Sequence, residues 1–191
     1  MPRSRNLVSH RSRKPGLRAC RFKSCPRRFT MSNTTFHQIK KLLDTNNIKY
    51  QVFDHEPVRT SEEAAAVRER LFGIKAEDIL KRGAKAMIVM VHHKPYQLII
   101  SAAKRIDFKK AKALLGGPVT FATEEDVVRL TDCLPGSVPP FGNLFDIPVY
   151  VDNSLLANET IDFNAGEKTV SMILNTKNWL SVVNPTMADF S

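Results

Sequence analysis

The chain has 191 residues, of which 42% are apolar, and this suffices for one domain with a hydrophobic core. No apolar run is long enough to span a bilayer, so the composition excludes a membrane-spanning protein and we expect no membrane partner. The formal net charge of +10 suggests nucleic-acid binding, but ten of the 29 bases and none of the acids lie in residues 1–30. The remaining residues are formally neutral. We therefore expect no DNA partner, and any contact of the domain with RNA must use a local basic patch.

Residues 1–30 are rich in arginine and lack periodic apolar residues, so we expect a basic extension without folded structure. Three interpretations fit this composition: an organellar transit peptide, an RNA-binding arm, or a gene start assigned too far upstream. We favour the third, with Met31 as the true start. Arg21–Cys25 reads like a translated T-arm of a tRNA gene, and a helical pattern begins directly after Met31. Residues 31–191 are the expected domain.

The three cysteines, at positions 20, 25 and 133, form no Cys-x-x-Cys pair and have no matching histidine spacing. This pattern predicts neither a disulfide framework nor a metal site, and we expect a reducing, cytoplasmic setting and no cofactor. Cys133 could act as a nucleophile, but no histidine lies near it in the sequence. We expect an ordinary half-buried thiol there.

Apolar periodicity and capping residues predict alternating helices and strands. Helices are expected over residues 33–46, 60–71, 76–81, 108–115, 124–131, 153–156 and 177–183. Strands are expected over residues 50–53, 84–91, 96–101, 119–122, 149–152, 160–163 and 170–174, with a hairpin turn at His92–Pro95. Thr60 and Glu63 form a capping box that opens the second helix. Because hairpins alternate with single crossovers, we expect the α+β class: one compact domain with a mixed, curled sheet flanked by helices.

Two features stand out as candidate sites. The loop Asp132–Gly142 holds three prolines and two glycines in eleven residues, so it is stiff and presents main-chain N–H groups. Lys85 begins an otherwise uninterrupted apolar strand, and its ammonium group should project from the strand end, where functional sites often gather. The structural alternatives are a tight connection for the loop and a lysine that merely reaches solvent.

With both features in hand, the chain resembles the YbaK/EbsC family, which includes free-standing aminoacyl-tRNA editing proteins and the editing insertion of bacterial prolyl-tRNA synthetases. The resemblance rests on five segments in order, at positions 55–64, 83–86, 106–110, 136–142 and 163–166. It implies a compact mixed sheet curled toward a barrel, with Lys85 as the functional lysine and Gly136–Pro140 as the Gly-x-x-x-Pro loop. Some relatives carry a histidine after the last segment. This chain has none beyond position 93, so we do not expect a histidine-dependent mechanism.

The implied activity is hydrolysis, in trans, of the ester that joins a mischarged small amino acid to the tRNA 3′ adenosine, with tRNA-Pro as one candidate tRNA. We expect Lys85 to hold the terminal phosphate or ribose, and the backbone of Gly136, Ser137 and Val138 to stabilise the oxyanion. A small pocket should exclude larger amino acids by size. The expected substrate-binding residues, in addition to Val138, are Thr60, Pro139, Pro140, Phe141, Gly142, Ala165 and Gly166. Ala, Cys, Ser and Pro all stay open as the amino acid.

The competing interpretation is a non-catalytic module that binds a tRNA end or a synthetase through the same loop. A neutral domain has little charge with which to bind tRNA alone, which fits either a weak trans-acting editor or a protein that needs a synthetase partner. A third interpretation is an RNA-binding protein that acts through the basic residues 1–30.

Overall fold

The computed structural model describes residues 34–58 and 60–191, so the expectations for residues 1–30 lie outside it. The helices are α1 Thr34–Thr45, α2 Ser61–Phe72, α3 Ala76–Arg82, α4 Phe108–Leu115, α5 Glu124–Thr131, η1 Gly142–Phe145, α6 Asn153–Leu156 and α7 Thr176–Val183. The strands are β1 Tyr50–Asp54, β2 Ala84–Val91, β3 Lys94–Ser101, β4 Thr120–Phe121, β5 Val149–Asp152, β6 Thr160–Asn164, β7 Val170–Asn175 and β8 Thr186–Ala188. Every predicted element is present, with ends within two residues of those expected.

The differences from the predicted elements are short and local. The turn between β2 and β3 consists of His92 and His93, with φ of 48° and 63°, while Lys94 and Pro95, predicted to lie in it, begin β3. Two successive residues with positive φ match the twist of a two-residue hairpin, which explains the shorter turn. Two short elements, η1 with four residues and β8 with three, were not predicted from the sequence.

The strands form two open sheets and not a closed barrel. Three antiparallel strands make up the first sheet, in the order β1-β7-β6. The second has the order β4-β2-β3-β5-β8 and is mixed, because β5 pairs in parallel with both β3 and β8. An isolated parallel bridge between Gly83 and Asp162 brings the start of β2 beside β6. The α+β class and the mixed sheet are confirmed, and this junction of the two sheets positions the site.

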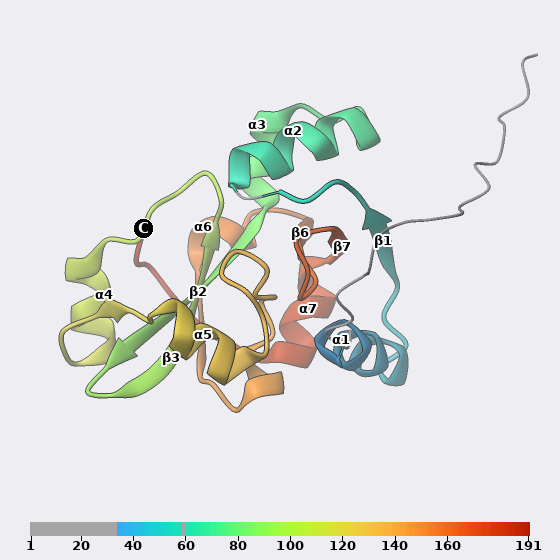
Figure 1. Ribbon diagram of the computed structural model, residues 1–191. Coiled ribbons are helices and arrows are strands. Elements are labelled where there is room, and N and C mark those ends of the chain that lie inside the picture. Colours follow the sequence, from blue (N-terminus) through green and yellow to red (C-terminus); the bar gives the residue numbers. More distant parts are fainter. Residues whose placement is uncertain (1–33, 59) are drawn as a thin grey trace, which may run out of the picture. The chain divides into compact units, whose positions relative to one another are not determined.

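Helices cover the two sheets from different sides (Figure 1). In the main core, α1 and α7 pack on the three-stranded sheet, with Leu43 and Trp179 fully buried among residues of β6 and β7. Ala111 of α4 and Val127 of α5 each pack against β2 of the larger sheet through a separate cluster. The pair α2 and α3 lies together at the end where β2 and β6 meet. The main packed cores therefore lie away from α2, which leaves room beneath it.

Candidate active site

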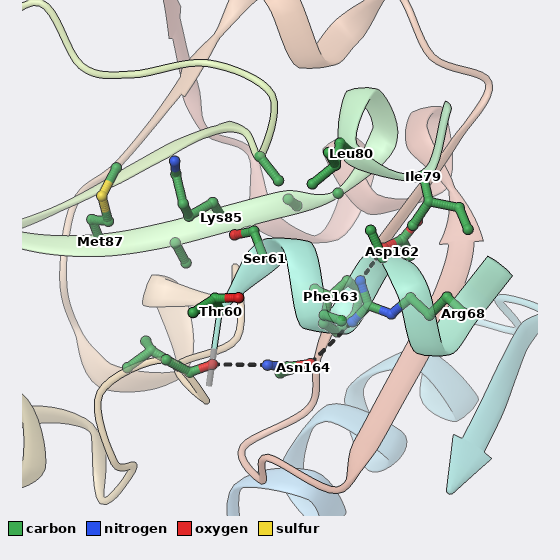
Figure 2. A pocket seen from close by; sticks show the side chains of 18 residues that line it. Thr60, Ser61, Arg68, Ile79, Leu80, Lys85, Met87, Asp162, Phe163 and Asn164 are labelled. Carbon is green, nitrogen blue, oxygen red and sulfur yellow. Dashed lines mark hydrogen bonds and ion pairs between the residues drawn. The ribbon is translucent and has the colours of Figure 1, made fainter. Parts of the chain in front are cut away.

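A cavity of about 320 Å³ opens beneath α2, between the start of β2, β6 and the loop Asp132–Gly142 (Figure 2). Much of its wall consists of side chains no larger than a methyl group: Ala64, Ala65, Ala84, Ala86 and Ala102. Polar groups enter it from Thr60 and Ser61 at the start of α2, from Lys85 on β2 and from Asn164 on β6. The cavity therefore suits a small ligand that is fixed at a few polar points.

Lys85 lies on β2 at the wall of this cavity, as its place at the start of an apolar strand predicts. Its Nζ donates to the backbone oxygen of Lys104 at 2.9 Å, and this bond directs the side chain along the cavity wall. Partial burial lowers the pKa of Lys85, an effect that Glu62 opposes and the nearby Arg105 reinforces. The ammonium group keeps two further N–H donors, which a phosphate or a ribose hydroxyl could accept.

The loop presents two backbone amides rather than three. Gly136 and Val138 line the cavity, although Val138 is only 8% exposed. Ser137 does not line it, and both the amide and the hydroxyl of Ser137 donate to Leu134 O, at 2.9 and 2.8 Å. Ser137 is thus removed from the donors expected to stabilise an oxyanion. Among the residues that the structure describes, no acceptor takes the amide hydrogen of Gly136 or Val138. Gly136 has a φ of 85°, a conformation that favours glycine.

The second half of the loop is buried in the core and does not line the cavity. The Gln97 side chain bonds this half at two points: its Oε1 accepts from Gly142 N at 2.8 Å, and its Nε2 donates to Pro139 O at 2.9 Å. Trp179 Nε1 donates to Pro140 O at 2.9 Å. Phe141 is fully buried. The expectation that Pro139–Gly142 contact the substrate therefore has no support in this geometry, and these residues instead anchor the loop.

Ala165 and Gly166 likewise support the loop from behind. The Gly166 amide donates to Ser137 O at 3.0 Å, and Ala165 is fully buried. Since the C=O and N–H of a trans peptide point in opposite directions, the bond to Ser137 O turns the Val138 amide away from Gly166. Thr60, by contrast, lies at the cavity and caps α2, with its hydroxyl oxygen accepting from Glu63 N at 3.1 Å.

A buried ion cluster forms the end of the cavity opposite Lys85, and the sequence reasoning missed it. Asp162 is fully buried and pairs with two guanidinium groups, those of Arg68 on α2 and Arg82 at the end of α3. Arg68 is itself only 6% exposed. Burial raises the pKa of Asp162 and lowers that of Arg68, while their mutual attraction opposes both shifts. The cluster fixes α2 over the junction of the two sheets.

Asn164 connects the ion cluster to the loop. Its Oδ1 accepts from Arg68 Nη2 at 3.0 Å, and its Nδ2 donates to Gly136 O at 2.8 Å (Figure 2). Arg68 also donates twice to Ser171 Oγ, at 3.2 and 2.8 Å, and His55 Nε2 lies 2.7 Å from the same oxygen. The Ser171 hydroxyl in turn donates to Asn164 Oδ1 at 3.4 Å. One network thus orients the peptide on which the Gly136 carbonyl lies.

Comparison with known proteins identifies the family. The model of the aminoacyl-tRNA editing domain matches residues 55–182, about two thirds of the chain, and this range includes every residue of the cavity. The chain belongs to the aminoacyl-tRNA editing domain family. The resemblance stated from the sequence motifs is thereby confirmed, and so is the expectation of an aminoacyl-tRNA editing enzyme at the level of the family.

Individual members of the editing domain family are similar over most of the chain. The multifunctional Ser/Thr-tRNA deacylase ProXp-y of Escherichia coli K12 is 26% identical over 164 residues, which cover 83% of this chain and 93% of that protein. The prolyl-tRNA editing protein ProX of Acetoanaerobium sticklandii is 23% identical over 146 residues, 74% of this chain and 85% of its own. A solved protein described provisionally as a trans-editing enzyme for prolyl tRNA synthetase is 25% identical, with a TM-score of 0.69 over 82% of this chain and 96% of that one.

Within this editing domain, the missed residues had weak sequence signals. Arg68 lies on α2 among Ala64, Ala65 and charged neighbours, so it reads as one more surface base of an amphipathic helix. Asp162 is the only ionisable residue of β6, and its place between Ile161 and Phe163 was the one signal that pointed to a buried charge. Their pairing spans 94 residues of sequence, which no local pattern predicts.

The described residues, 34–58 and 60–191, contain neither a metal-ligand cluster nor a membrane-spanning helix. Within these ranges no three His, Cys, Asp or Glu side chains gather as metal ligands would. No helix within them has the length and hydropathy that crossing a membrane requires. Cys133 is 2% exposed, and its Sγ donates to Thr131 O at 3.2 Å, outside the cavity lining.

Proposed function

We propose that this protein is a trans-acting deacylase that hydrolyses the ester between a small amino acid and the 3′ terminal adenosine of a mischarged tRNA, in the cytoplasm. The observation that carries the proposal is one cavity lined by Lys85 on one wall and by Gly136 and Val138 on another, where neither amide of the pair has an acceptor among residues 34–58 and 60–191. An ester linked to a phosphorylated ribose requires a cation to hold its phosphate or ribose end and amide donors to stabilise the oxyanion at its carbonyl end.

In the proposed reaction, water attacks the ester carbonyl and its oxygen becomes an oxyanion, which the Gly136 and Val138 amides stabilise. A donor of this kind typically contributes about 3–4 kcal/mol. The C–O bond then breaks, and the 3′ oxygen of the ribose takes up the proton that the water has lost, through the vicinal hydroxyl. The ester is already activated, so no nucleophilic side chain is needed. Lys85 holds the ribose or its phosphate so that the carbonyl meets the amides.

The cavity of about 320 Å³ must hold the amino acid together with part of the terminal adenosine, and this shared volume supports a small amino acid. A wall of this kind separates side chains that differ by one methylene by only about 1–3 kcal/mol. The relative ProXp-y is named for Ser and Thr, and ProX for prolyl-tRNA. The candidate substrates are therefore tRNAs, tRNA-Pro included, that carry Ala, Cys, Ser, Thr or Pro. A synthetase partner would supply the tRNA affinity that the neutral domain lacks.

The test is deacylation of these aminoacyl-tRNAs by the full-length protein and by Lys85→Ala. We expect release of one or two amino acids, and a loss of about 100-fold in the variant because the ester is no longer positioned. Lys81→Ala is the matched control, since Lys81 is an exposed lysine on the neighbouring helix α3. Absence of turnover by folded wild-type protein would leave a binding module in place of the enzyme. Equal rates for wild type and Lys85→Ala would remove Lys85 from the mechanism.

A further inference from the structure

The neutral charge of residues 31–191 raises the question of where RNA could contact the domain. The segment 104–112 carries five basic side chains and one acidic side chain, the highest local excess of positive charge outside residues 1–30. Of the five, Lys110 pairs with Asp189 at 2.9 Å. For the other four, no carboxylate among the described residues lies within ion-pair distance. We call these four residues the basic strip: Lys104, Arg105, Lys109 and Lys112.

The single acid within the segment does not neutralise the basic strip. Asp107 caps α4, and its Oδ1 accepts the amides of Lys109 and Lys110 at 2.8 and 3.3 Å. These backbone bonds, together with the charges of Lys110 and Lys109, lower the pKa of Asp107, so its carboxylate offsets one of the five positive charges. The segment 104–112 still keeps a formal excess of four positive charges.

The strip begins at the cavity and runs away from it along α4. Lys85 Nζ donates to Lys104 O, so the first residue of the strip lies against the lysine of the site. On α4, Lys109 and Lys112 are three residues apart and share one helix face, while Ala111 packs into the core. Any polymer with a negative backbone whose end enters the cavity beside Lys85 would meet Lys104 and Arg105 next, and then α4.

Two exposed aromatic rings lie beside the strip. Phe108, one turn before Lys112 on α4, is 41% exposed, and Phe121 on β4 is 55% exposed. Their rings meet edge to face, with centroids 5.2 Å apart. The pair therefore holds apolar surface open to solvent next to unpaired cations. Exposed aromatic rings offer faces on which unpaired nucleobases stack. The adjacent Lys and Arg side chains can neutralise the phosphates of the same strand.

We propose that the basic strip, together with the ring pair Phe108 and Phe121, is the surface on which the tRNA acceptor end lies as it enters the cavity. This inference rests on the proposed function for the identity of the nucleic acid. The charge complementarity favours RNA over a protein partner, because the segment 104–112 carries five cations against one carboxylate, whereas a mixed protein interface would carry both signs in similar numbers. The strip supplies the local patch that the neutral domain requires.

The experiment compares two full-length triple variants. Arg105, Lys109 and Lys112 are replaced by Gln in the strip variant. Lys41, Lys49 and Lys177 are replaced by Gln in the control, since these exposed lysines belong to the end of the domain that holds α1 and α7 (Figure 1). Affinity for an uncharged tRNA-Pro transcript is measured by fluorescence anisotropy over a series of salt concentrations. Each lost phosphate contact lowers the slope of log K against log salt by about 0.7–0.9.

We expect the strip variant to lose roughly ten- to a hundredfold in affinity near physiological salt, and about two to three units of slope. The control should bind as the wild type does. Phe108→Ala combined with Phe121→Ala should weaken binding without changing the slope, because stacking releases no counterions. Equal binding by the strip variant and the control would overturn the proposal. A loss seen only when the ten bases of residues 1–30 are replaced by Gln would overturn it too.

A second readout separates this inference from the proposed function. The 3′ aminoacyl esters of adenosine, with Ala, Cys or Ser, are too short to reach α4. The strip variant should hydrolyse these esters as fast as the wild type and show a raised KM only on full aminoacyl-tRNA. Equal losses on both substrates would place the strip in the chemistry and refute an RNA surface. If the wild type hydrolyses neither substrate while the strip still carries tRNA binding, the proposed function fails and the surface stands.

Discussion

Replacement of Asp162 by Asn tests the buried ion cluster most directly, since it keeps the shape of the side chain and removes its charge. Asp162 is 0% exposed and receives one ion pair from Arg68 and one from Arg82. Without the carboxylate, two guanidinium groups stay close together, with their side chains only 7% and 15% exposed. Loss of one partner from a buried ion pair typically costs about 3–5 kcal/mol, and we expect a cost in this range.

The assay is equilibrium unfolding in urea at 25 °C, with the free energy of unfolding extrapolated to water. Asp126→Asn is the matched control, because Asp126 pairs with Arg129 at 2.6 Å on the solvent-facing side of α5. An exposed pair of this kind contributes about 0.2–1 kcal/mol. A domain of this size has a total stability of about 5–15 kcal/mol, so the Asp162 variant should fold but unfold at much lower urea.

A cost for Asp162→Asn as small as that of the control would refute the reasoning, since it would mean that water screens the cluster. Arg82→Met gives an independent measurement if the asparagine variant is too unstable to study. It removes the less buried of the two cations and leaves Arg68 paired with Asp162. We expect it to cost less than Asp162→Asn, and the reverse order would contradict the assigned geometry.

Three further predictions follow from single residues. In an NMR titration of the lysine side chains, Lys85 should lose its proton at lower pH than an ordinary lysine, because burial lowers its pKa. Lys81 should lose its proton at higher pH, because Glu77 raises its pKa. The reverse order would exclude the burial of Lys85. Gly142→Ala should lower the free energy of unfolding in urea by about 1–3 kcal/mol, because the new Cβ would lie 2.7 Å from a methyl group of Val149 and 2.9 Å from the backbone oxygen of Ile147. Gly117→Ala is the control and should cost less, because its Cβ would meet the ring of His92, which can move. Cys133→Ala should keep full deacylation activity, because the thiol is buried outside the cavity and burial raises its pKa; a large loss of activity would return Cys133 to the candidate nucleophiles.

The local elements could be predicted because short-range chemistry specifies them. Thr60 accepts from Glu63 N and begins α2, and Gly116, with a φ of 74°, ends α4. The uninterrupted apolar run after Lys85 predicted both the strand β2 and the place of the lysine at a cavity. Each of these signals lies within a few residues of the structure that it specifies, so the sequence alone suffices to find them.

Only the tertiary structure decided which part of the loop lines the cavity and which part is buried in the core. The sequence presented Gly136–Gly142 as one stiff segment, and nothing local distinguished the part that faces the cavity from the part that lies in the core. Gln97 and Trp179, 42 and 39 residues away in sequence from their partners, bind the carbonyls of Pro139 and Pro140 and draw that half of the loop inward. Asn164, fixed by Arg68, binds the Gly136 carbonyl and holds the first half at the cavity. Hydrogen-bond partners brought together by the fold, and not the composition of the loop, decide which amides stay open to a ligand.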